Sequence, residues 1–506
     1  MRRAVIVRNA AVLLGAQPVT WSLTLIFMIV VPRSVGAAEW GEWSIGWAVS
    51  LIARAALDFG INTVLLKEVA KDKSRAEELV GAAVAAKLVL AVPLLLAVLG
   101  FSFIAGYSPH TRLILAIIAV TTAVSFVGTP TVLALQALEK MHVNAIGSIL
   151  TQATITVVAV LLVKVAATGM VSISIVNFGG VALGTALQWL WLGRSVRIRP
   201  IFRWTLMRTL LVDGLPYWAS ALFLTIYVFV DGVMISIFCS PREVGWYGVA
   251  TQIIATLGFL PYAVTTAVFP ALTHNFRNDR GELAVLAGRS FRFLMTVGIP
   301  ASVGLALVAN SLVLSIYSVP FAPAAPVLTL LAFTLLPVFA ATLVNGFLIA
   351  TDRQVHWTWV MAGLCVVNPI VNVFTIRYFH ATQGNGALGA AVALLATDLA
   401  TGAAAIWLLP AELRGAARSA IPAMVRSAGA TALMAGVVWP LRYQFVPVPV
   451  LAGLATFLAS ALALRVFPAE EVAVLMAVPR RLLGRRRASA ARLGPSDQPV
   501  PAELAG

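Results

Sequence analysis

Apolar runs of about 20 residues alternate with short polar turns along almost the whole chain. An α-helix needs about 20 consecutive apolar residues to cross the hydrocarbon core of a bilayer. We therefore predict one membrane helix for each run. The fourteen runs cover residues 10–31, 44–66, 79–103, 112–136, 145–166, 171–192, 211–238, 246–271, 289–316, 324–350, 357–379, 386–409, 421–441 and 448–467.

The composition supports this interpretation, since 60% of the residues are hydrophobic, 11% are charged and the mean hydropathy is +0.93. A soluble protein of 506 residues cannot hide so much apolar surface from water. The first run continues to Val31 without a small-residue cleavage site, which indicates an uncleaved membrane helix and not a signal peptide. The sequence thus predicts an all-α polytopic membrane protein with about 14 transmembrane helices.

Arginine and lysine are distributed unevenly between the loops. With the N-terminus inside, 28 of the 36 basic residues fall in inside segments and 6 in outside segments, while Arg54 and Lys87 lie within helices. Cytoplasmic loops carry the excess of basic residues in membrane proteins, so we predict that both chain ends are cytoplasmic in a cell (inner or plasma) membrane. The net charge of +16 then reflects these loops, and we expect no nucleic-acid partner.

A short motif recurs at the outer end of two helical hairpins. Glu39–Trp43 reads Glu-Trp-Gly-Glu-Trp after the first helix, and Glu243–Tyr247 reads Glu-Val-Gly-Trp-Tyr after the seventh. A Tyr-Ser pair likewise follows the third helix at Tyr107 and the ninth at Tyr317. Helices 1–6 and 7–12 are therefore predicted to be parallel repeats that form two lobes with a cavity between them.

This repeat predicts a division of the chain into five parts. They are an N-terminal six-helix lobe (1–192), a basic cytoplasmic connector (193–210), a C-terminal six-helix lobe (211–409), two additional helices (421–467) and a basic, partly disordered cytoplasmic tail (468–506). We expect the connector and the basic start of the tail to contact anionic lipid headgroups.

No motif of a soluble enzyme is present in the sequence. There is no P-loop, no nucleophile elbow and no metal-ligand spacing, so we expect no enzyme activity and no resident cofactor. Cys239 and Cys365 lie in separate apolar runs and predict neither a disulfide nor a metal site. Aromatic residues at outer helix ends are typical of an interfacial belt. These residues are Trp40, Trp43, Trp47, Trp246 and Tyr247.

Three charged residues inside the first lobe are the first candidate site. Arg54 and Asp58 are four residues apart on the second helix, so they share a face, and Lys87 is expected at a similar depth on the third helix. Charges at bilayer depth are costly and usually mark a functional path. Either an internal salt bridge joins the two helices, or these residues form a cationic patch that receives an anionic substrate headgroup.

A second candidate site consists of polar residues in the second lobe. They are Asp231 on the seventh helix, Asn368 and Asn372 on the eleventh, and Thr397 and Asp398 on the twelfth. Carboxylate, amide and hydroxyl oxygens are the ligands of a coupling cation or the members of a proton relay, with Na⁺ or H⁺ as the ion. Hydrogen bonding between helices is the alternative interpretation.

Several of these motifs together resemble the polysaccharide-type flippases of the multidrug/oligosaccharidyl-lipid/polysaccharide (MOP) exporter superfamily. The resemblance spans nearly the whole chain. It is carried by Arg33-x-x-Gly36-x-x-Glu39-Trp40-Gly41-x-Trp43, Asp58-Phe59-Gly60-Ile61, Lys67-Glu68-Val69-Ala70, Asp231-Gly232-Val233-Met234, Glu243-Val244-Gly245-x-Tyr247 and Gly384-x-Gly386-Ala387-Leu388-Gly389.

The resemblance implies a V-shaped bundle of two six-helix lobes that works by alternating access. It also implies export of an undecaprenyl-pyrophosphate-linked oligosaccharide to the outer leaflet for cell-surface polysaccharide synthesis, with polysaccharide polymerases or glycosyltransferases of the same pathway as partners. The related lipid II flippases add two helices that form a groove for the lipid tail. Some of them hold sodium at positions comparable to Asp231, Asn368, Asn372 and Thr397, with a carboxylate where this chain has Asn372.

Three other functions remain as alternatives. A lipid II flippase is disfavoured because the arginine-rich motif of its second helix is reduced here to Arg54. A cation-coupled multidrug antiporter of the same superfamily is expected to have twelve helices and carboxylates in the first lobe. A membrane-embedded glycosyltransferase or polymer ligase is expected to have a large outside loop, whereas the longest one here is about a dozen residues.

Overall fold

The computed structural model describes residues 2–194, 199–351 and 353–467, and these residues form helices and turns without a strand. Within them, eleven helices are long and apolar enough to cross a membrane, and the number rises to thirteen if each of two bent helix pairs is one span. Pro447–Ala463 is also apolar but shorter. The polytopic all-helical prediction is confirmed, and the predicted count of about 14 is approximate.

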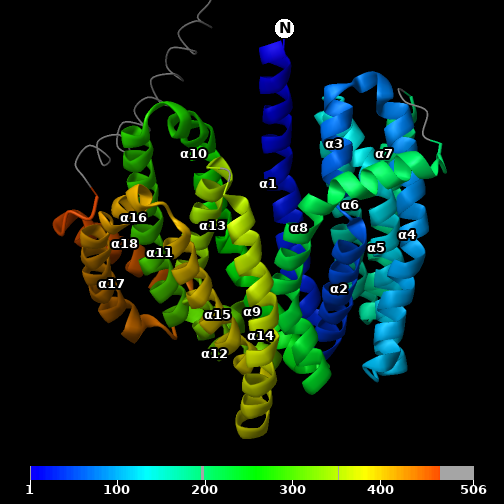
Figure 1. Cartoon of the computed structure of the whole chain (residues 1–506). Coiled ribbons are helices and arrows are strands. Elements are labelled where there is room, and N and C mark those ends of the chain that lie inside the picture. The colour runs from blue at the N-terminus through cyan, green and yellow to red at the C-terminus, as the bar shows by residue number, and fades with distance from the viewer. Residues whose placement is uncertain (1, 195–198, 352, 468–506) are drawn as a thin grey trace, which may run out of the picture.

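The first helix group contains α1 to α7 and lies on the right of Figure 1, in blue to cyan. The N-terminus lies at the top of α1. The helices of this group are α1 (Arg2–Val35), α2 (Ala37–Asp58), α3 (Ile61–Lys71), α4 (Ala76–Ile104), α5 (Pro109–Ala137), α6 (Met141–Leu161) and α7 (Met170–Gly193).

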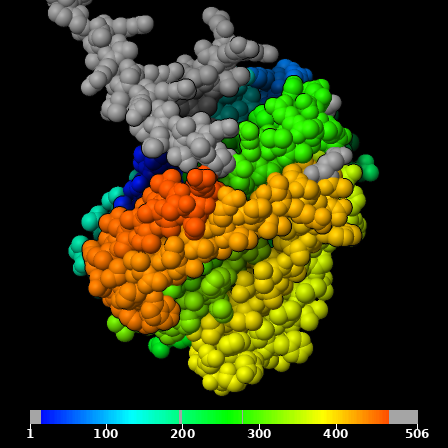
Figure 2. Space-filling view, turned by 90° about the vertical axis from the view of Figure 1, so that its left-hand side faces the viewer, coloured from blue at the N-terminus to red at the C-terminus, as the bar shows by residue number. Residues whose placement is uncertain are grey.

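The second helix group contains α8 to α15, and α16 to α18 follow it. Helices α17 and α18 pack on each other and on α11, and form the orange face of Figure 2. The helices are α8 (Trp204–Phe238), α9 (Pro241–Leu257), α10 (Phe259–Asn278), α11 (Arg280–Tyr317), α12 (Ala324–Ala332), α13 (Leu335–Ala350), α14 (Gln354–Gln383), α15 (Gly386–Leu408), α16 (Ala411–Arg418), α17 (Ile421–Leu441) and α18 (Pro447–Ala463).

The second predicted span is broken in its middle. Helices α2 and α3 meet at an angle of 53°, because Phe59 and Gly60 between them both have left-handed backbone angles, with φ of +46° and +71°. Gly60 also lies against the backbone of Gly214 in α8. A Cβ on Gly60 would collide with the backbone of Gly214, and a Cβ on Gly214 would collide with the backbone of Phe59 and Gly60. At this bend α8 lies against the break, and Asp58 is the last residue of α2.

The predicted repeat corresponds to a matched pair of helix caps. A carboxylate oxygen of Glu39 accepts a hydrogen bond from the backbone N–H of Met170, the first residue of α7. Glu243 accepts one from the N–H of Gly386, the first residue of α15, at 2.7 Å. Each glutamate thus satisfies a backbone donor at the start of the last helix of its own group, where a negative charge is also favoured.

The two groups meet where α2 crosses α9, and the repeated glycines form this contact. A Cβ on Gly41 would collide with the backbone carbonyl of Pro241, and a Cβ on Gly245 would collide with that of Ala37. The relation is reciprocal, as expected for two copies of one motif around a shared axis. Only glycine lets the two backbones approach this closely.

Gly41→Ala is therefore expected to lower the free energy of unfolding by at least about 2 kcal/mol, the usual cost of forcing an extra carbon into a packed interior. The measurement is equilibrium unfolding of the purified protein in mixed micelles. Gly100→Ala in α4 is the matched control, since a Cβ there meets nothing within 4 Å. It should leave stability unchanged or raise it by up to about 1 kcal/mol. Equal effects of the two substitutions would contradict the close-contact argument.

The structure describes the predicted connector in part. The described part of the connector lies against α4, where the N–H of Ile201 donates to the carbonyl of Gly81 at 3.0 Å and Arg203 pairs with Glu78 at 2.9 Å. The predicted tail, 468–506, lies outside the described residues.

The interfacial-belt interpretation is wrong for most of its aromatic residues, because Trp40, Trp43, Trp246 and Tyr247 are at most 9% exposed and pack between helices.

Candidate functional site

A polar cavity of about 550 Å³ lies between α1, α2, α5, α6 and α7. Hydroxyl and amide side chains make up most of its lining, and Arg54 is the one charged side chain among the described residues that line it. The other polar lining residues are Gln17, Thr20, Ser125, Thr129, Asn144, Ser148, Thr151, Gln152, Thr185 and Gln188. Such a surface offers many hydrogen bonds and a single positive charge.

The cavity continues toward the second helix group. A second chamber of about 630 Å³ shares Thr151, Gln152 and Val181 with the first, and is lined by the rings of Trp40, Trp43 and Trp47 and by residues of α8 and α9. A groove of about 900 Å³ between α1, α9 and α10 shares Trp21 with the first chamber and Gln252 with the second. The shared residues indicate one continuous space between the two helix groups.

Arg54 is held in place by two hydroxyl groups of α5. Its Nη1 donates to Ser125 Oγ at 3.3 Å and its Nη2 to Thr129 Oγ1 at 3.0 Å. A guanidinium has five N–H donors in a planar fork, so these two bonds leave most of its donors for a ligand. Both hydroxyl partners are neutral, and the carboxylate of Asp58, one helical turn away on α2, is paired with Lys87.

Lys87 and Asp58 form an ion pair deeper in the first group. Lys87 Nζ lies 2.9 Å from Asp58 Oδ1 and 2.7 Å from Asn62 Oδ1, and its side chain is fully buried. Asn62 also donates to Asp58 at 2.9 Å, and the ring of Phe126 lies 4.3 Å from the ammonium group. The pair ties α4 to the break between α2 and α3.

The structure thus separates the three charges that were grouped from the sequence. Arg54 points into the cavity, while neither Asp58 nor Lys87 is among the described residues that line it. The geometry of Lys87 and Asp58 is that of the internal salt bridge, one of the two interpretations of the sequence. A role of this pair in binding the substrate headgroup stays a prediction.

The candidate residues of the second group do meet, in a buried polar cluster formed by α8, α14 and α15. Asn372 Nδ2 donates to Asp231 Oδ1 at 2.7 Å and to Asn368 Oδ1 at 2.8 Å, and Asn368 Nδ2 donates to Thr397 Oγ1 at 3.2 Å. Each of these four side chains is at most 2% exposed. We call this set, together with Asp398, the oxygen cluster.

Two tyrosines that sequence reasoning missed complete the oxygen cluster. Tyr247 Oη donates to Asp231 Oδ2 at 2.7 Å, and Tyr227 Oη donates to Asp398 Oδ1 at 2.6 Å. Asn372 Oδ1 is buried and has no hydrogen-bond partner among the residues that the structure describes. A buried acceptor without a donor is uncommon in native proteins and calls for an unseen partner. A small cation or a proton carrier at this point fits the donor set, which consists of oxygen atoms.

Comparison with known proteins now adds to this geometry. Residues 6–276, a little more than half of the 506-residue chain, match the family described as "Polysaccharide biosynthesis protein". The chain belongs to this family. Among curated proteins, none matches the chain. The family assignment agrees with the resemblance found in the sequence motifs.

Solved structures with the same fold are transporters of the MOP superfamily. The lipid II flippase MurJ in an inward closed conformation has a TM-score of 0.72 at 14% identity, over 91% of this chain and 99% of that one. An inward-facing multidrug resistance MATE family transporter has a TM-score of 0.63 at 13% identity, over 79% and 95%. A MOP superfamily transporter from Pyrococcus furiosus has a TM-score of 0.54 at 14% identity, over 83% and 96%. This member of the polysaccharide biosynthesis family thus has the fold of these transporters, and its many membrane-length helices indicate a multi-pass membrane protein.

Proposed function

We propose that this protein is a flippase that moves an undecaprenyl-pyrophosphate-linked oligosaccharide from the cytoplasmic to the outer leaflet of the cell membrane by alternating access. The observation that carries this proposal is Arg54, the one charged side chain among the described residues that line the polar cavity of the first helix group, where its guanidinium donates to two neutral hydroxyls. A forked guanidinium is the side chain best suited to a pyrophosphate, which it binds through two parallel hydrogen bonds.

The rest of the cavity suits the other parts of such a substrate. Hydroxyl and amide side chains beside Arg54 offer donors and acceptors to sugar hydroxyls, and the half-buried Trp47 in the second chamber offers an apolar ring to a sugar face. The groove between α1 and α10 is lined by Trp21, Leu25, Phe259 and other apolar residues, and opens a path for a polyprenyl chain. The substrate would then span the boundary between protein and lipid.

The division of the chain follows from this mechanism. The lobes 1–192 and 211–409 would rock against each other, and the connector 193–210 would join them at the cytoplasmic surface. The crossing of α2 and α9 gives them a tight glycine contact about which to turn. The additional helices within 421–467 pack on α11, where they would shape a path for the lipid tail. Both termini would lie in the cytoplasm, and enzymes of the same glycan pathway would be the partners.

A coupling ion, Na⁺ or H⁺, is proposed for the oxygen cluster. The cluster supplies the carboxylate of Asp231, the amide oxygens of Asn368 and Asn372, and the hydroxyl of Thr397, all buried and within hydrogen-bond distance of a neighbour. Hard oxygen ligands bind sodium, and the Tyr227–Asp398 pair would allow a proton to take its place. The unpartnered oxygen of Asn372 supports an ion at this point.

Translocation in liposomes tests the proposal. Purified protein is reconstituted with a fluorescent polyprenyl-pyrophosphate oligosaccharide, and the outer leaflet is quenched over time. Wild-type protein should carry the fluorescent lipid from the protected inner leaflet to the outer leaflet, where it is quenched. Arg54→Ala should slow this translocation at least about tenfold, because a hydrogen bond to a charged group contributes about 1.5–3 kcal/mol. Arg54→Lys keeps the charge without the fork and should fall between the two.

Arg377→Ala, on an exposed face of α14 away from the cavity, is the matched control and should translocate normally. Equal rates for Arg54→Ala and wild type would overturn the assignment of the headgroup to Arg54. A wild-type protein that moves no glycan lipid would overturn the flippase proposal itself. A drug-efflux assay would then address the antiporter alternative, which the cavity disfavours because its described lining has no carboxylate to attract a cationic drug.

A further inference from the structure

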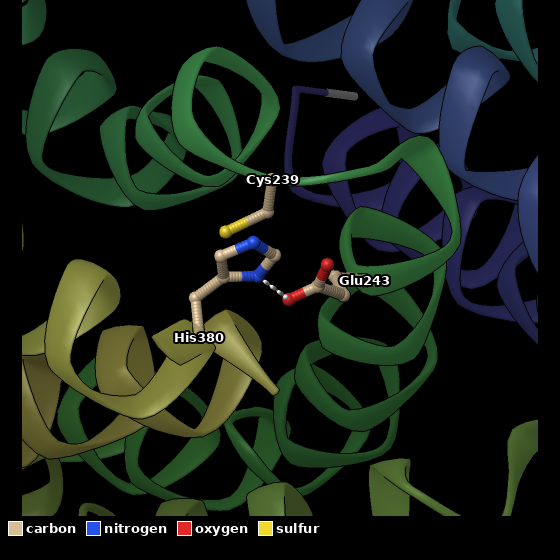
Figure 3. A group of neighbouring side chains, drawn as sticks. All are labelled: Cys239, Glu243 and His380. Atoms are coloured by element: carbon tan, nitrogen blue, oxygen red, sulfur yellow. Dashed lines mark hydrogen bonds and ion pairs between the residues drawn. The ribbon is translucent and has the colours of Figure 1, made fainter. Parts of the chain in front are cut away.

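Three side chains of metal-ligating type meet at one end of the second helix group. None of them belongs to the oxygen cluster. Cys239 lies in the turn after α8, Glu243 in the first turn of α9 and His380 in the last turn of α14. Figure 3 shows the three side chains pointing toward one another, with the imidazole between the thiol and the carboxylate. Their ligand atoms all lie within 4.8 Å of one another.

We propose that Cys239, Glu243 and His380 bind a thiophilic divalent cation of the zinc class, with a fourth position left for water. A thiolate, an imidazole and a carboxylate are the three ligand types that zinc takes in proteins. Zinc bonds of about 2.0–2.3 Å place tetrahedral ligand atoms about 3.3–3.8 Å apart. The spread of 4.8 Å or less in the structure requires only a small inward movement of side chains.

The carboxylate is already held in position by its surroundings. Glu243 is 3% exposed, and its Oε1 accepts hydrogen bonds from the N–H and the hydroxyl of Ser240 at 3.3 and 3.1 Å. Its Oε2 accepts the N–H of Gly386 at 2.7 Å. Such outer hydrogen bonds orient a ligand and are a regular feature of metal sites.

The imidazole gives an ion its access. The His380 side chain is 45% exposed, and its Nδ1 lies 3.1 Å from Glu243 Oε2. Without a metal, the Nδ1–H group donates a hydrogen bond to this oxygen. An ion entering from the exposed side would replace that hydrogen bond with two bonds to the metal, and the displaced proton would leave Nδ1 for Nε2 or solvent. The thiol of Cys239 would release its proton as the third bond forms.

The bound ion would fasten the end of α14 to the turn between α8 and α9. It would also act on α15, because Glu243 caps the first residue of that helix. A plain hydrogen-bonded cap is the competing interpretation of these contacts, and it requires no cysteine. The proposal therefore depends on whether Cys239 contributes a bond to a metal.

Cobalt(II) alone, added to the full-length protein in detergent micelles, provides the test. The protein carries a histidine-free affinity tag, so that no other cluster of imidazoles competes. A thiolate bound to cobalt gives a charge-transfer band in the near ultraviolet, and only Cys239 and Cys365 can produce it, since the chain has two cysteines. Cys365→Ser is the matched control, because Cys365 donates to the backbone carbonyl of Phe223 at 3.0 Å, away from the cluster.

The expected result is a saturable band in wild type and in Cys365→Ser that is lost in Cys239→Ser. His380→Asn, at a half-exposed position that should not disturb folding, is expected to weaken cobalt binding about 10-fold or more. Zinc should raise the thermal unfolding temperature of the wild type and not that of His380→Asn. The absence of the band in folded wild-type protein, or its persistence in Cys239→Ser, would overturn the proposal. Neither result depends on transport activity.

Discussion

Lys87→Met should lower the free energy of unfolding by about 3–5 kcal/mol, the usual cost of removing one partner of a buried ion pair. The reason is the full burial of Lys87 and the partial burial of Asp58. The side chain is fully buried and its ammonium group donates to Asp58 and Asn62, so its loss leaves the Asp58 carboxylate without its paired cation. The methionine has a similar length, which keeps the packing against Phe126.

Equilibrium unfolding in mixed micelles measures this change in the free energy of unfolding. Lys164→Met, at an exposed position, is the control. The double variant Lys87→Met/Asp58→Leu should recover part of the loss, because no charge is then left buried and unpaired. A single variant as stable as the control would contradict the structural role of the pair. A stable Lys87→Met protein that fails to translocate glycan lipid would instead support the headgroup role predicted from the sequence.

The membrane helices were predictable because the bilayer leaves little choice of structure. Backbone groups in hydrocarbon must bond within their own segment, so an apolar run of sufficient length becomes a helix whatever its neighbours are. The break at Phe59 and Gly60 was not predictable in the same way. Glycine is common in membrane helices, and the left-handed conformation of Phe59 occurs where Gly60 packs against Gly214, a residue distant in sequence.

The repeat was visible in the sequence, whereas its physical meaning required the structure. Glu39 and Glu243 were recognised by their common spacing to glycine and aromatic residues. Their shared task, capping the helices that begin at Met170 and Gly386, involves partners more than 130 residues away. Hydrogen bonds over such separations leave no local signal in one sequence.

The polarity of single residues within apolar helices was enough to identify part of each candidate site. Asp231, Asn368 and Asn372 were recognisable because polar side chains in apolar helices are costly and rarely accidental. Tyr247 was missed because a tyrosine near a helix end is equally typical of the membrane interface, and Tyr227 because an aromatic residue inside an apolar run does not differ from ordinary core packing. Cys239, Glu243 and His380 were missed because the third ligand follows the second after 137 residues, a spacing that no short metal motif covers.

Asp231→Asn is expected to remove the response of translocation to an ion gradient. Under the proposed coupling, Asp231 carries the negative charge of a buried oxygen cluster, and asparagine keeps its shape without that charge. Allosteric coupling of about 1–3 kcal/mol corresponds to a factor of about 5–150, so the gradient-dependent stimulation should fall by at least about fivefold. The measurement is glycan-lipid translocation in liposomes with an imposed sodium gradient or an imposed pH gradient.

Comparison of the two gradients identifies the ion, and Asp213→Asn serves as the control. Asp213 lies on the same helix α8 but is exposed, so this change should leave the stimulation intact. Slow translocation without any gradient should persist in Asp231→Asn, because the Arg54 cavity is unchanged and a flippase can equilibrate its substrate downhill. If wild-type translocation ignores both gradients, the oxygen cluster is a set of interhelical hydrogen bonds. Asp231→Asn would then lower the free energy of unfolding, since the Tyr247 hydroxyl would lose a charged acceptor.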